Sequence, residues 1–422
     1  MRRKAHIDSN QSLPGAPLAC SFCGRAEQDV GTLIAGPSVY ICERCVAEYS
    51  DQVRRAAGPR DLPSLGGLAK PRDIHGFLDE YVVGQDHAKK VLSVAVYNHY
   101  KRVAHRSAGG VLEIGKSNIL LVGPSGSGKT LLAQTLARFL DVPLAVADAT
   151  CLTEAGYVGE DVESVIQRLL SQCDNDAEKA RRGIVYLDEI DKLARRSHNP
   201  THSRDVSGEG VQQSLLKLME GTVVHVPVPG GRRGQQEQLA VDTRDILFIC
   251  GGAFSGLDEL VSRRRVERSI GFNAAVDDGT DGARHLQERL EPQDFMAYGL
   301  IPELIGRLPV VAALDALDEE ALVRILTEPS NALLRQFRIL LAMDDCELVF
   351  TEGAQRAIAR EALSRGTGAR GLRAVVERVL LEPMFSMPQA HGDRLVIDED
   401  GVLATAGPRY EYRQAPVDRI AQ

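Results

Sequence analysis

The sequence predicts an α/β protein with a parallel sheet, a smaller and mainly helical domain after it, and a small four-cysteine module before it. Three observations support this fold class. Short apolar runs alternate with helical periods between residues 77 and 307, helical periods dominate after Pro309, and two pairs of cysteines lie near the amino terminus. The predicted parts are a cysteine module at 15–50, a linker at 51–73, an α/β domain at 74–312, a helical domain at 313–410 and a tail at 411–422.

The paired cysteines have the spacing of a zinc site. Cys20 and Cys23, then Cys42 and Cys45, form two C-x2-C pairs separated by 18 residues. A segment of roughly 35 residues is too small to be stabilised by an apolar core of its own, whereas bound zinc contributes on the order of 10 kcal/mol. We therefore expect four thiolates to hold a structural Zn²⁺, the alternative being reduced free thiols. The other cysteines are predicted to be small buried apolar residues: Cys151, Cys173, Cys250 and Cys346.

The composition is that of an ordinary soluble protein. Its 50 Lys and Arg against 58 Asp and Glu give a net charge of -8, which provides no sequence-wide attraction for nucleic acid or an anionic membrane and leaves only a local basic patch open. The basic start is followed by polar residues rather than by the apolar stretch of a signal peptide. The apolar runs are far shorter than the roughly 20 residues of a membrane helix. We therefore expect a cytoplasmic protein without a membrane partner.

Four apolar runs predict buried parallel strands, with helices between them as in βαβ units. The runs are 118–123, 143–149, 183–189 and 245–252. Residues 207–221 predict one of the helices, with Val211, Leu215 and Leu218 on one face. In the helical domain, helices are predicted at 319–341, 352–365 and 370–384, and a short sheet at 346–350 and 394–398.

A glycine-rich stretch between the first strand and the next helix predicts a phosphate-binding loop. Residues 123–130, GPSGSGKT, satisfy G-x4-G-K-[ST]. Glycines allow backbone N–H groups to turn toward a phosphate at a helix amino terminus, whose dipole favours anions. Lys129 would neutralise phosphate oxygens, and the Thr130 hydroxyl would bind Mg²⁺. The expected nucleotide-binding residues of this stretch are Gly123, Pro124, Ser125, Gly126, Ser127, Gly128, Lys129, Thr130 and Leu131.

Two adjacent carboxylates follow a later strand. Asp188 and Glu189 end the run IVYLDE, where the chain can turn both into the phosphate cleft. Asp188 would hold Mg²⁺, directly or through water, and Glu189 would polarise the attacking water. A carboxylate pair alone is common at solvated strand ends, so this interpretation depends on the phosphate loop. A switch, a nucleic-acid motor and a protein-remodelling motor would all use such a site.

These motifs, in this order, resemble those of the ClpX family of AAA+ unfoldases, which deliver proteins to the ClpP peptidase. The resemblance runs from Cys20 to about Ile397. It implies an AAA+ P-loop ATPase that uses ATP, Mg²⁺ and Zn²⁺ and assembles into a homo-hexamer. It also implies unfolded or tagged proteins as substrates, adaptor proteins as partners of the zinc module, and ClpP as the peptidase. No intrinsic peptidase activity is expected, because no Ser-His-Asp or Cys-His arrangement stands out beside the ATPase site.

The resemblance implies further nucleotide contacts. Val83 and Gln85 would line the adenine pocket, and Arg370 would contact the nucleotide from the helical domain. Arg307 would be the arginine finger, which reaches the γ-phosphate held by a neighbouring subunit. Taken alone, either arginine is more simply a surface or ion-pair residue.

The resemblance also implies pore and docking residues. Tyr157 and Val158, within GYVG, would grip the substrate in the central pore. Arg232 and Arg233 lie where the family carries Arg-Lys-His at the pore entrance, so two cations remain and the imidazole is absent. The residues implied to dock on ClpP are Ile270, Gly271 and Phe272.

Two other functions stay open. One is a regulator whose zinc module binds DNA while the ATPase switches its oligomeric state, although the acidic balance and the absence of a basic helix in the module argue against it. The other is an ATPase that remodels proteins without a peptidase, which Ile270 and Phe272 argue against.

Overall fold

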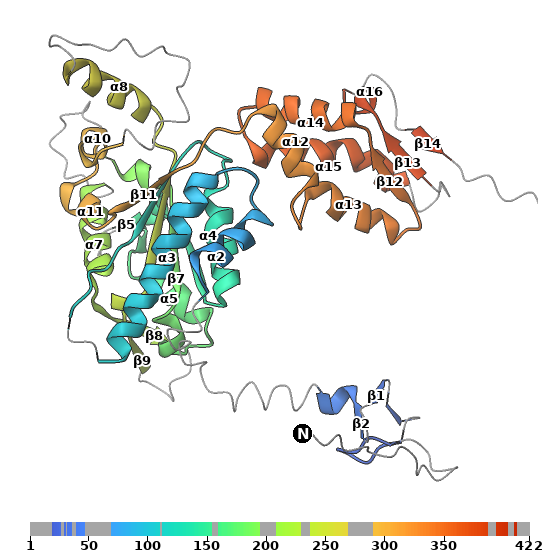
Figure 1. The fold of residues 1–422 in the computed structure, drawn as a ribbon, viewed down its shortest axis with the longest axis horizontal. Coiled ribbons are helices and arrows are strands. Elements are labelled where there is room, and N and C mark those ends of the chain that lie inside the picture. The colour runs from blue at the N-terminus through green and yellow to red at the C-terminus, as the bar shows by residue number, and fades with distance from the viewer. Residues whose placement is uncertain are drawn as a thin grey trace, which may run out of the picture. The chain divides into compact units, whose positions relative to one another are not determined.

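The computed structural model describes residues 19–26, 29–30, 32–35, 39–46, 69–109, 112–153, 159–194, 208–228, 237–268, 290–386, 394–403 and 409–411. Contacts within the chain divide it into two units, Met1–Gly66 and Gly67–Gln422. Their helices and strands are numbered in chain order, and many of them are labelled in Figure 1.

In the first unit, two short strands lie between the two pairs of cysteines, and the second strand ends at Cys42. β1 (Leu33–Ala35) pairs antiparallel with β2 (Tyr40–Cys42). The buried centre consists of three thiol-bearing residues with Val30, Leu33 and Ile41 around them: Cys20, Cys42 and Cys45. So small an apolar cluster agrees with a fold that relies on a bound metal.

The second unit is built on a five-stranded, fully parallel sheet with the order β11-β3-β10-β7-β4. The strands are β3 (Ile119–Val122), β4 (Leu144–Asp148), β7 (Ile184–Asp188), β10 (Leu247–Gly252) and β11 (Val310–Ala313). The four predicted strands are confirmed. The fifth, β11, was not predicted, because its four residues directly follow Pro309 and form too short a run to be distinguished without knowledge of their pairing with β3.

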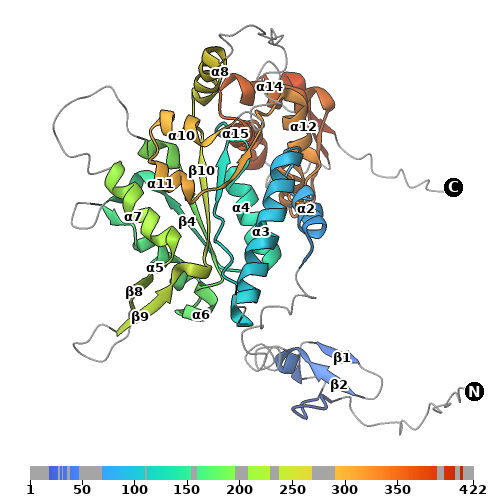
Figure 2. The ribbon, with the colours of Figure 1, turned by 60° about the vertical axis from the view of Figure 1, so that its left-hand side comes forward.

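Helices cover both faces of this sheet. α2 (Pro71–Asp79), α3 (Asp86–Ser107) and α4 (Lys129–Leu140) lie on one side, and α5 (Ser164–Ser171) and α7 (Glu209–Glu220) lie on the other, as the views in Figures 1 and 2 show. Alternate strand residues face opposite sides, so Leu120 and Val122 pack with the α5 and α7 side while their neighbours face α4. The helix predicted at 207–221 is confirmed as α7, with its three apolar residues buried.

Shorter elements complete this α/β part. The antiparallel hairpin β8 (Val223–Val228) and β9 (Glu237–Asp242) was not predicted. The remaining strands and helices are β5 (Leu152–Thr153), β6 (Glu160–Asp161), α6 (Ala177–Ala180), α8 (Leu257–Arg268), α10 (Pro292–Tyr298) and α11 (Pro302–Gly306). The one-turn 3-10 helices are η2 (Ala149–Cys151), η3 (Ile190–Leu193) and η4 (Thr243–Asp245).

The carboxy-terminal part of the chain is mainly helical and has its own core. Its helices are α12 (Glu319–Thr327), α13 (Leu333–Ala342), α14 (Glu352–Ser364), α15 (Ala369–Ser386) and α16 (Glu399–Val402). Its sheet has the order β12 (Glu347–Phe350), β13 (Arg394–Ile397) and β14 (Arg409–Glu411). The predicted helix at 319–341 is in fact two helices, because Pro329 cannot continue α12. Capping side chains begin α12 and α14: Asp318 accepts from the Ala321 N–H and Thr351 from the Ala354 N–H.

Two local expectations differ from the structure. α2 begins at Pro71, inside the stretch predicted as linker, because proline is well suited to the first position of a helix. Cys151 is exposed, whereas Cys173, Cys250 and Cys346 are buried as predicted. The prediction for Cys151 was wrong because this residue ends a one-turn helix after β4, which is the outermost strand of the sheet.

Candidate nucleotide and zinc sites

The four cysteines of the first unit form a compact cluster. The sulfurs of Cys20 and Cys45 are 3.9 Å apart, those of Cys23 and Cys42 are 3.7 Å apart, and all four lie within 4.8 Å of one another. A tetrahedral zinc with Zn–S bonds of about 2.3 Å requires sulfurs about 3.8 Å apart. The Cys42 N–H also donates to Cys20 Sγ over 3.3 Å, and such a bond favours the charged thiolate that binds a metal. This donor set matches a closed, structural zinc site.

The phosphate loop leaves the carboxyl end of β3 and enters α4. Its start is tied to the sheet, since the Gly123 N–H donates to the Gly252 carbonyl at the end of β10 over 3.2 Å. Gly126 and Gly128 have φ angles of +76° and +103°, which side-chain-bearing residues rarely adopt. The loop therefore turns its backbone toward the amino terminus of α4, a helix long enough to carry a substantial dipole.

Lys129 lies inside this loop. Its Nζ donates to the Gly123 carbonyl over 2.6 Å and to the Pro124 carbonyl over 2.9 Å. Burial lowers the pKa of Lys129, while the charges of Asp188 and Asp191 act in the opposite direction. The ammonium is thus held where a phosphate bound by the loop would meet it.

The side chains of Thr130, at the start of α4, and Asp188, the last residue of β7, are in contact. Thr130 Oγ1 donates to Asp188 Oδ2 over 3.1 Å. The hydroxyl of Tyr186 donates to the other carboxylate oxygen, Asp188 Oδ1, over 3.2 Å. A hydroxyl and a carboxylate are ligands that Mg²⁺ prefers, so these two side chains fit a magnesium ion beside the phosphates. The tyrosine was not predicted, although a phenol in a buried strand signals a hydrogen-bonding partner.

Glu189 lies at a sharp turn. Its φ angle is +57°, and its N–H donates to Asp188 Oδ1 over 3.0 Å. A left-handed conformation in a residue other than glycine is strained and is often found at functional sites. The turn ends β7 and leaves the Glu189 side chain exposed at the same edge of the sheet as the phosphate loop.

The helical part reaches the phosphate loop through the turn before α15. The Ala369 N–H donates to the Gly126 carbonyl over 3.4 Å, and a Cβ on Gly126 would clash with the Thr367 carbonyl at 2.5 Å. Arg370, the next residue, is close enough to Lys129 for its charge to lower the pKa of that lysine. The structure therefore brings Arg370 to the loop, and its contact with the nucleotide, which the resemblance implies, stays a prediction.

The segment before α3 also lies beside the loop. Val83 is buried, and the side chain of its neighbour Val82 is 4.0 Å from a Cβ placed on Gly128. The Gln85 amide is bonded at both ends to the backbone of Asp315, donating over 2.9 Å and accepting over 2.8 Å. Gln85 thus holds the connector between β11 and α12, a contact that sequence could not reveal.

Arg307 lies at the opposite edge of the sheet. Its carbonyl accepts from Asn118 Nδ2 over 3.0 Å, and Asn118 directly precedes β3. The phosphate loop begins at Gly123, five residues after Asn118 and about 16 Å away along the strand. Arg307 is therefore not brought to the phosphate loop of its own chain.

The remaining predicted residues lie outside the described part of the chain. They are Tyr157, Val158, Arg232, Arg233, Ile270, Gly271 and Phe272. Their attachment points are described: β5 ends at Thr153, which lies against Gly159 just before β6, and the hairpin strands β8 and β9 flank the segment with the two arginines.

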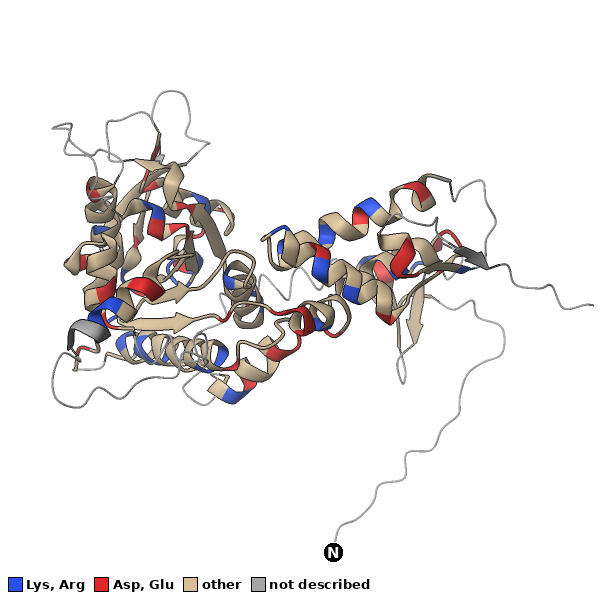
Figure 3. Ribbon diagram, turned by 90° about the horizontal axis from the view of Figure 1, so that it is seen from above, with Lys and Arg blue, Asp and Glu red and all other residues tan. Residues whose placement is uncertain are grey.

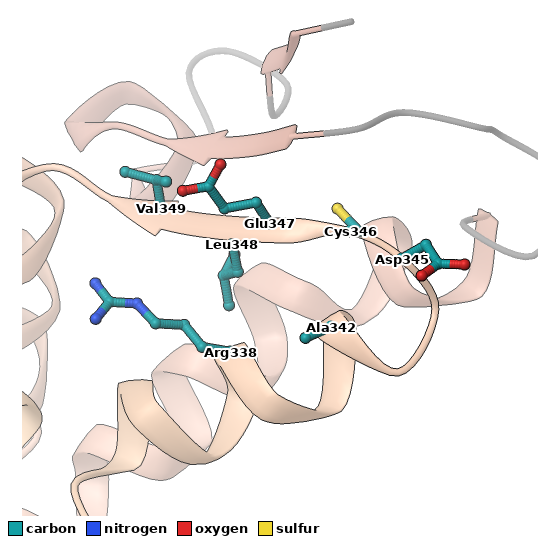
Figure 4. A pocket seen from close by; sticks show the side chains of 7 residues that line it. All are labelled: Arg338, Ala342, Asp345, Cys346, Glu347, Leu348 and Val349. Carbon is teal, nitrogen blue, oxygen red and sulfur yellow. The ribbon is translucent and has the colours of Figure 1, made fainter. Parts of the chain in front are cut away.

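A separate groove of about 510 Å³ lies in the helical part, between α13 and β12, as Figure 4 shows. It is lined by Arg338, Ala342, Asp345, Cys346, Glu347, Leu348 and Val349. None of these residues belongs to the nucleotide or zinc site.

Comparison with known proteins gives matches over most of the chain. Residues 18–54 match the ClpX C4-type zinc finger, residues 115–311 the AAA domain (Cdc48 subfamily), and residues 317–393 the C-terminal, D2-small domain of ClpB protein. The ATP-dependent Clp protease ATP-binding subunit ClpX of Treponema denticola is 47% identical over 386 residues, which cover 91% of this chain and 93% of the relative. The protein of the same name from Porphyromonas gingivalis is 47% identical, with coverages of 90% and 94%.

Proposed function

The chain belongs to the ClpX family of ATP-dependent Clp protease subunits, and on that premise we propose that it is a protein unfoldase that threads its substrates into a ClpP peptidase. It is an AAA+ ATPase, and its cofactors are ATP, Mg²⁺ and Zn²⁺. A homo-hexameric ring, a cytoplasmic location and adaptor docking on the zinc module are parts of the same proposal.

The convergence of Lys129, Thr130 and Asp188 carries the proposal. Backbone N–H groups of the loop and the Lys129 ammonium would bind the phosphates, and Thr130 and Asp188 would hold Mg²⁺. When bound, Mg²⁺ neutralises charge on the phosphate oxygens. Glu189, exposed at the same edge, would orient water for attack.

The position of Arg307 supports a ring. Because it lies at the edge of the sheet opposite its own phosphate loop, its guanidinium can stabilise charge only on a nucleotide held by another subunit. The turn before α15 would then transmit the nucleotide state to the helical part through Gly126, and the segment from Thr153 to Gly159 would move the Tyr157 grip along the pore.

Charge argues against the alternative DNA-binding regulator. Figure 3 shows acidic and basic residues interspersed along the helices, and Arg324 with Glu328 and Arg373 with Glu377 form such pairs.

None of the helices in the described ranges is long and apolar enough to cross a membrane.

The proposal is tested by following a stably folded, tagged protein in the presence of ATP, with and without ClpP. We expect the substrate to unfold only when ATP is present, and to be degraded only when ClpP is added as well. Unfolding without degradation would favour the peptidase-independent alternative. In that case the substitution Phe272→Ala should leave the fate of the substrate unchanged, with or without ClpP. An intact substrate under both conditions, together with salt-dependent DNA binding, would favour the regulator.

A further inference from the structure

Helix α7 contains a fully buried amide that bridges two functional elements. Gln212 Nε2 donates to the Leu193 carbonyl over 2.8 Å, and Gln212 Oε1 accepts from the Ile301 N–H over 2.8 Å. Leu193 ends η3, the turn that begins directly after Glu189, and Ile301 is the residue that precedes α11. The two ends of the amide thus donate to one backbone group and accept from the other at once.

The same helix contacts the other end of α11. Glu220, the last residue of α7, accepts two hydrogen bonds from Arg307, from Nε over 3.0 Å and from Nη2 over 2.7 Å. Arg307 directly follows α11, which spans only five residues. α7 therefore holds both ends of α11. Gln212 contacts the residue before α11, and Glu220 contacts the residue after it.

The carboxyl end of α7 is itself anchored. Thr243 Oγ1 donates to the Leu218 carbonyl over 2.8 Å and accepts from the Thr222 N–H over 2.9 Å. Because these bonds join the carboxyl end of α7 to η4 beside the central sheet, Glu220 lies at a fixed end of the helix, whereas Gln212 lies near its other end, bonded to the turn that follows Glu189.

We propose that α7 couples the hydrolysis site of a subunit to the arginine that this subunit offers to its neighbour, with Gln212 and Glu220 as positioning residues. The inference rests on the proposed function, in which Arg307 acts in trans. A change at the Glu189 turn moves the Leu193 carbonyl, Gln212 carries that movement to the start of α11, and Glu220 presents the guanidinium that follows α11.

The Arg307–Glu220 pair is suited to exchange. Its side chains are 51% and 43% exposed, and ion pairs with such exposure are weak, so a phosphate with greater negative charge can take the guanidinium from the carboxylate. Before that exchange, the two hydrogen bonds hold Arg307 in one conformation and reduce the entropy that a trans contact must remove.

The first test is Glu220→Gln in the full chain, with Glu178→Gln as the matched control. Glu178 is another exposed glutamate in an arginine pair, bound to Arg181 over 2.6 Å, and it lies outside the proposed path. We expect Glu220→Gln to lower kcat for ATP about three- to tenfold with little change in KM, and to reduce the Hill coefficient toward 1. The control should keep both values.

The second test is Gln212→Met, which keeps the side-chain length and removes both hydrogen bonds. It should reduce the Hill coefficient as Glu220→Gln does, and the double variant should show no further reduction, because both residues serve one path. Ring assembly, ATP-analogue binding and the thermal unfolding midpoint separate this effect from misfolding. Two variants with wild-type kcat and Hill coefficient would overturn the inference, as would fully additive effects. A wild-type chain without ATP hydrolysis or assembly would instead overturn the proposed function.

Discussion

Thr130 Oγ1 and Asp188 Oδ2 lie 3.1 Å apart, although the two residues belong to different βα units of the sheet. The contact exists because β3 and β7 both pair with β10, which brings the helix after β3 beside the carboxyl end of β7. A hydroxyl and a carboxylate thereby meet next to the Lys129 ammonium. The parallel sheet, rather than either motif alone, forms the magnesium and phosphate site.

Tyr186→Phe should weaken that site without abolishing it. The Tyr186 hydroxyl donates to Asp188 Oδ1 over 3.2 Å, and its loss leaves the carboxylate held less firmly, by the Glu189 N–H and the Thr130 hydroxyl. We expect kcat to fall about three- to tenfold and the Mg²⁺ concentration for half-maximal ATPase activity to rise.

The matched control for this change is Tyr100→Phe. Tyr100 is also buried, and its hydroxyl donates to the Arg182 carbonyl over 3.1 Å, away from the nucleotide residues. If the two variants need the same Mg²⁺ concentration for half-maximal ATPase activity, a positioning role for Tyr186 is contradicted.

Glu189→Gln should retain nucleotide and lose turnover. The amide cannot polarise water, whereas the loop residues that bind phosphate are untouched, so hydrolysis should fall about 10²- to 10⁴-fold. Phosphate release and binding of a fluorescent ATP analogue, measured on the same preparation, test this. Near-normal phosphate release would show that another residue is the base.

His99 should make the protein sensitive to acid. Burial, together with the charges of Arg102 and Lys116, lowers the pKa of His99 from 6.5 to about 3, so the folded protein keeps this imidazole neutral. Below pH 6.5 the unfolded chain binds a proton that the folded chain does not, so stability is lost as the pH falls. The loss is at most about 1.4 kcal/mol for each pH unit.

The variant His99→Gln keeps a donor for the Asp245 carbonyl, which His99 Nε2 contacts over 3.0 Å, and removes the titration. Its thermal unfolding midpoint should fall less than that of the wild type between pH 7 and pH 5. Parallel curves for the two proteins would exclude His99 as a source of acid sensitivity.

Cys45→Ser should unfold the zinc module and spare the ATPase. A hydroxyl is a poor zinc ligand, and three thiols with a small apolar cluster cannot stabilise the module, whereas Gly67–Gln422 forms a separate unit. Zinc content should fall to background while ATP hydrolysis stays near the wild-type rate. Full zinc retention in the variant would contradict the four-thiolate assignment.

Several features could be predicted from sequence because their signals are local. The glycine spacing of 123–130, the C-x2-C pairs and four apolar runs identified the phosphate loop, the zinc cluster and four strands. β11 and the β8–β9 hairpin were not predicted, since strands of four or six residues carry too little periodicity to be recognised without knowledge of their pairing.

The amino-acid sequence by itself determined the chemistry of this protein: which groups can bind phosphate, magnesium and zinc, and in which order they occur. Tertiary structure alone decided which of these groups meet, as with Gln85 and Asp315, Gln212 and Ile301, or Arg307 and Glu220. The physical reason is the distance along the sequence over which each kind of interaction acts. Glycine conformations and ligand spacings act over a few residues, whereas these contacts join residues 230, 89 and 87 positions apart and depend on the register of the whole sheet.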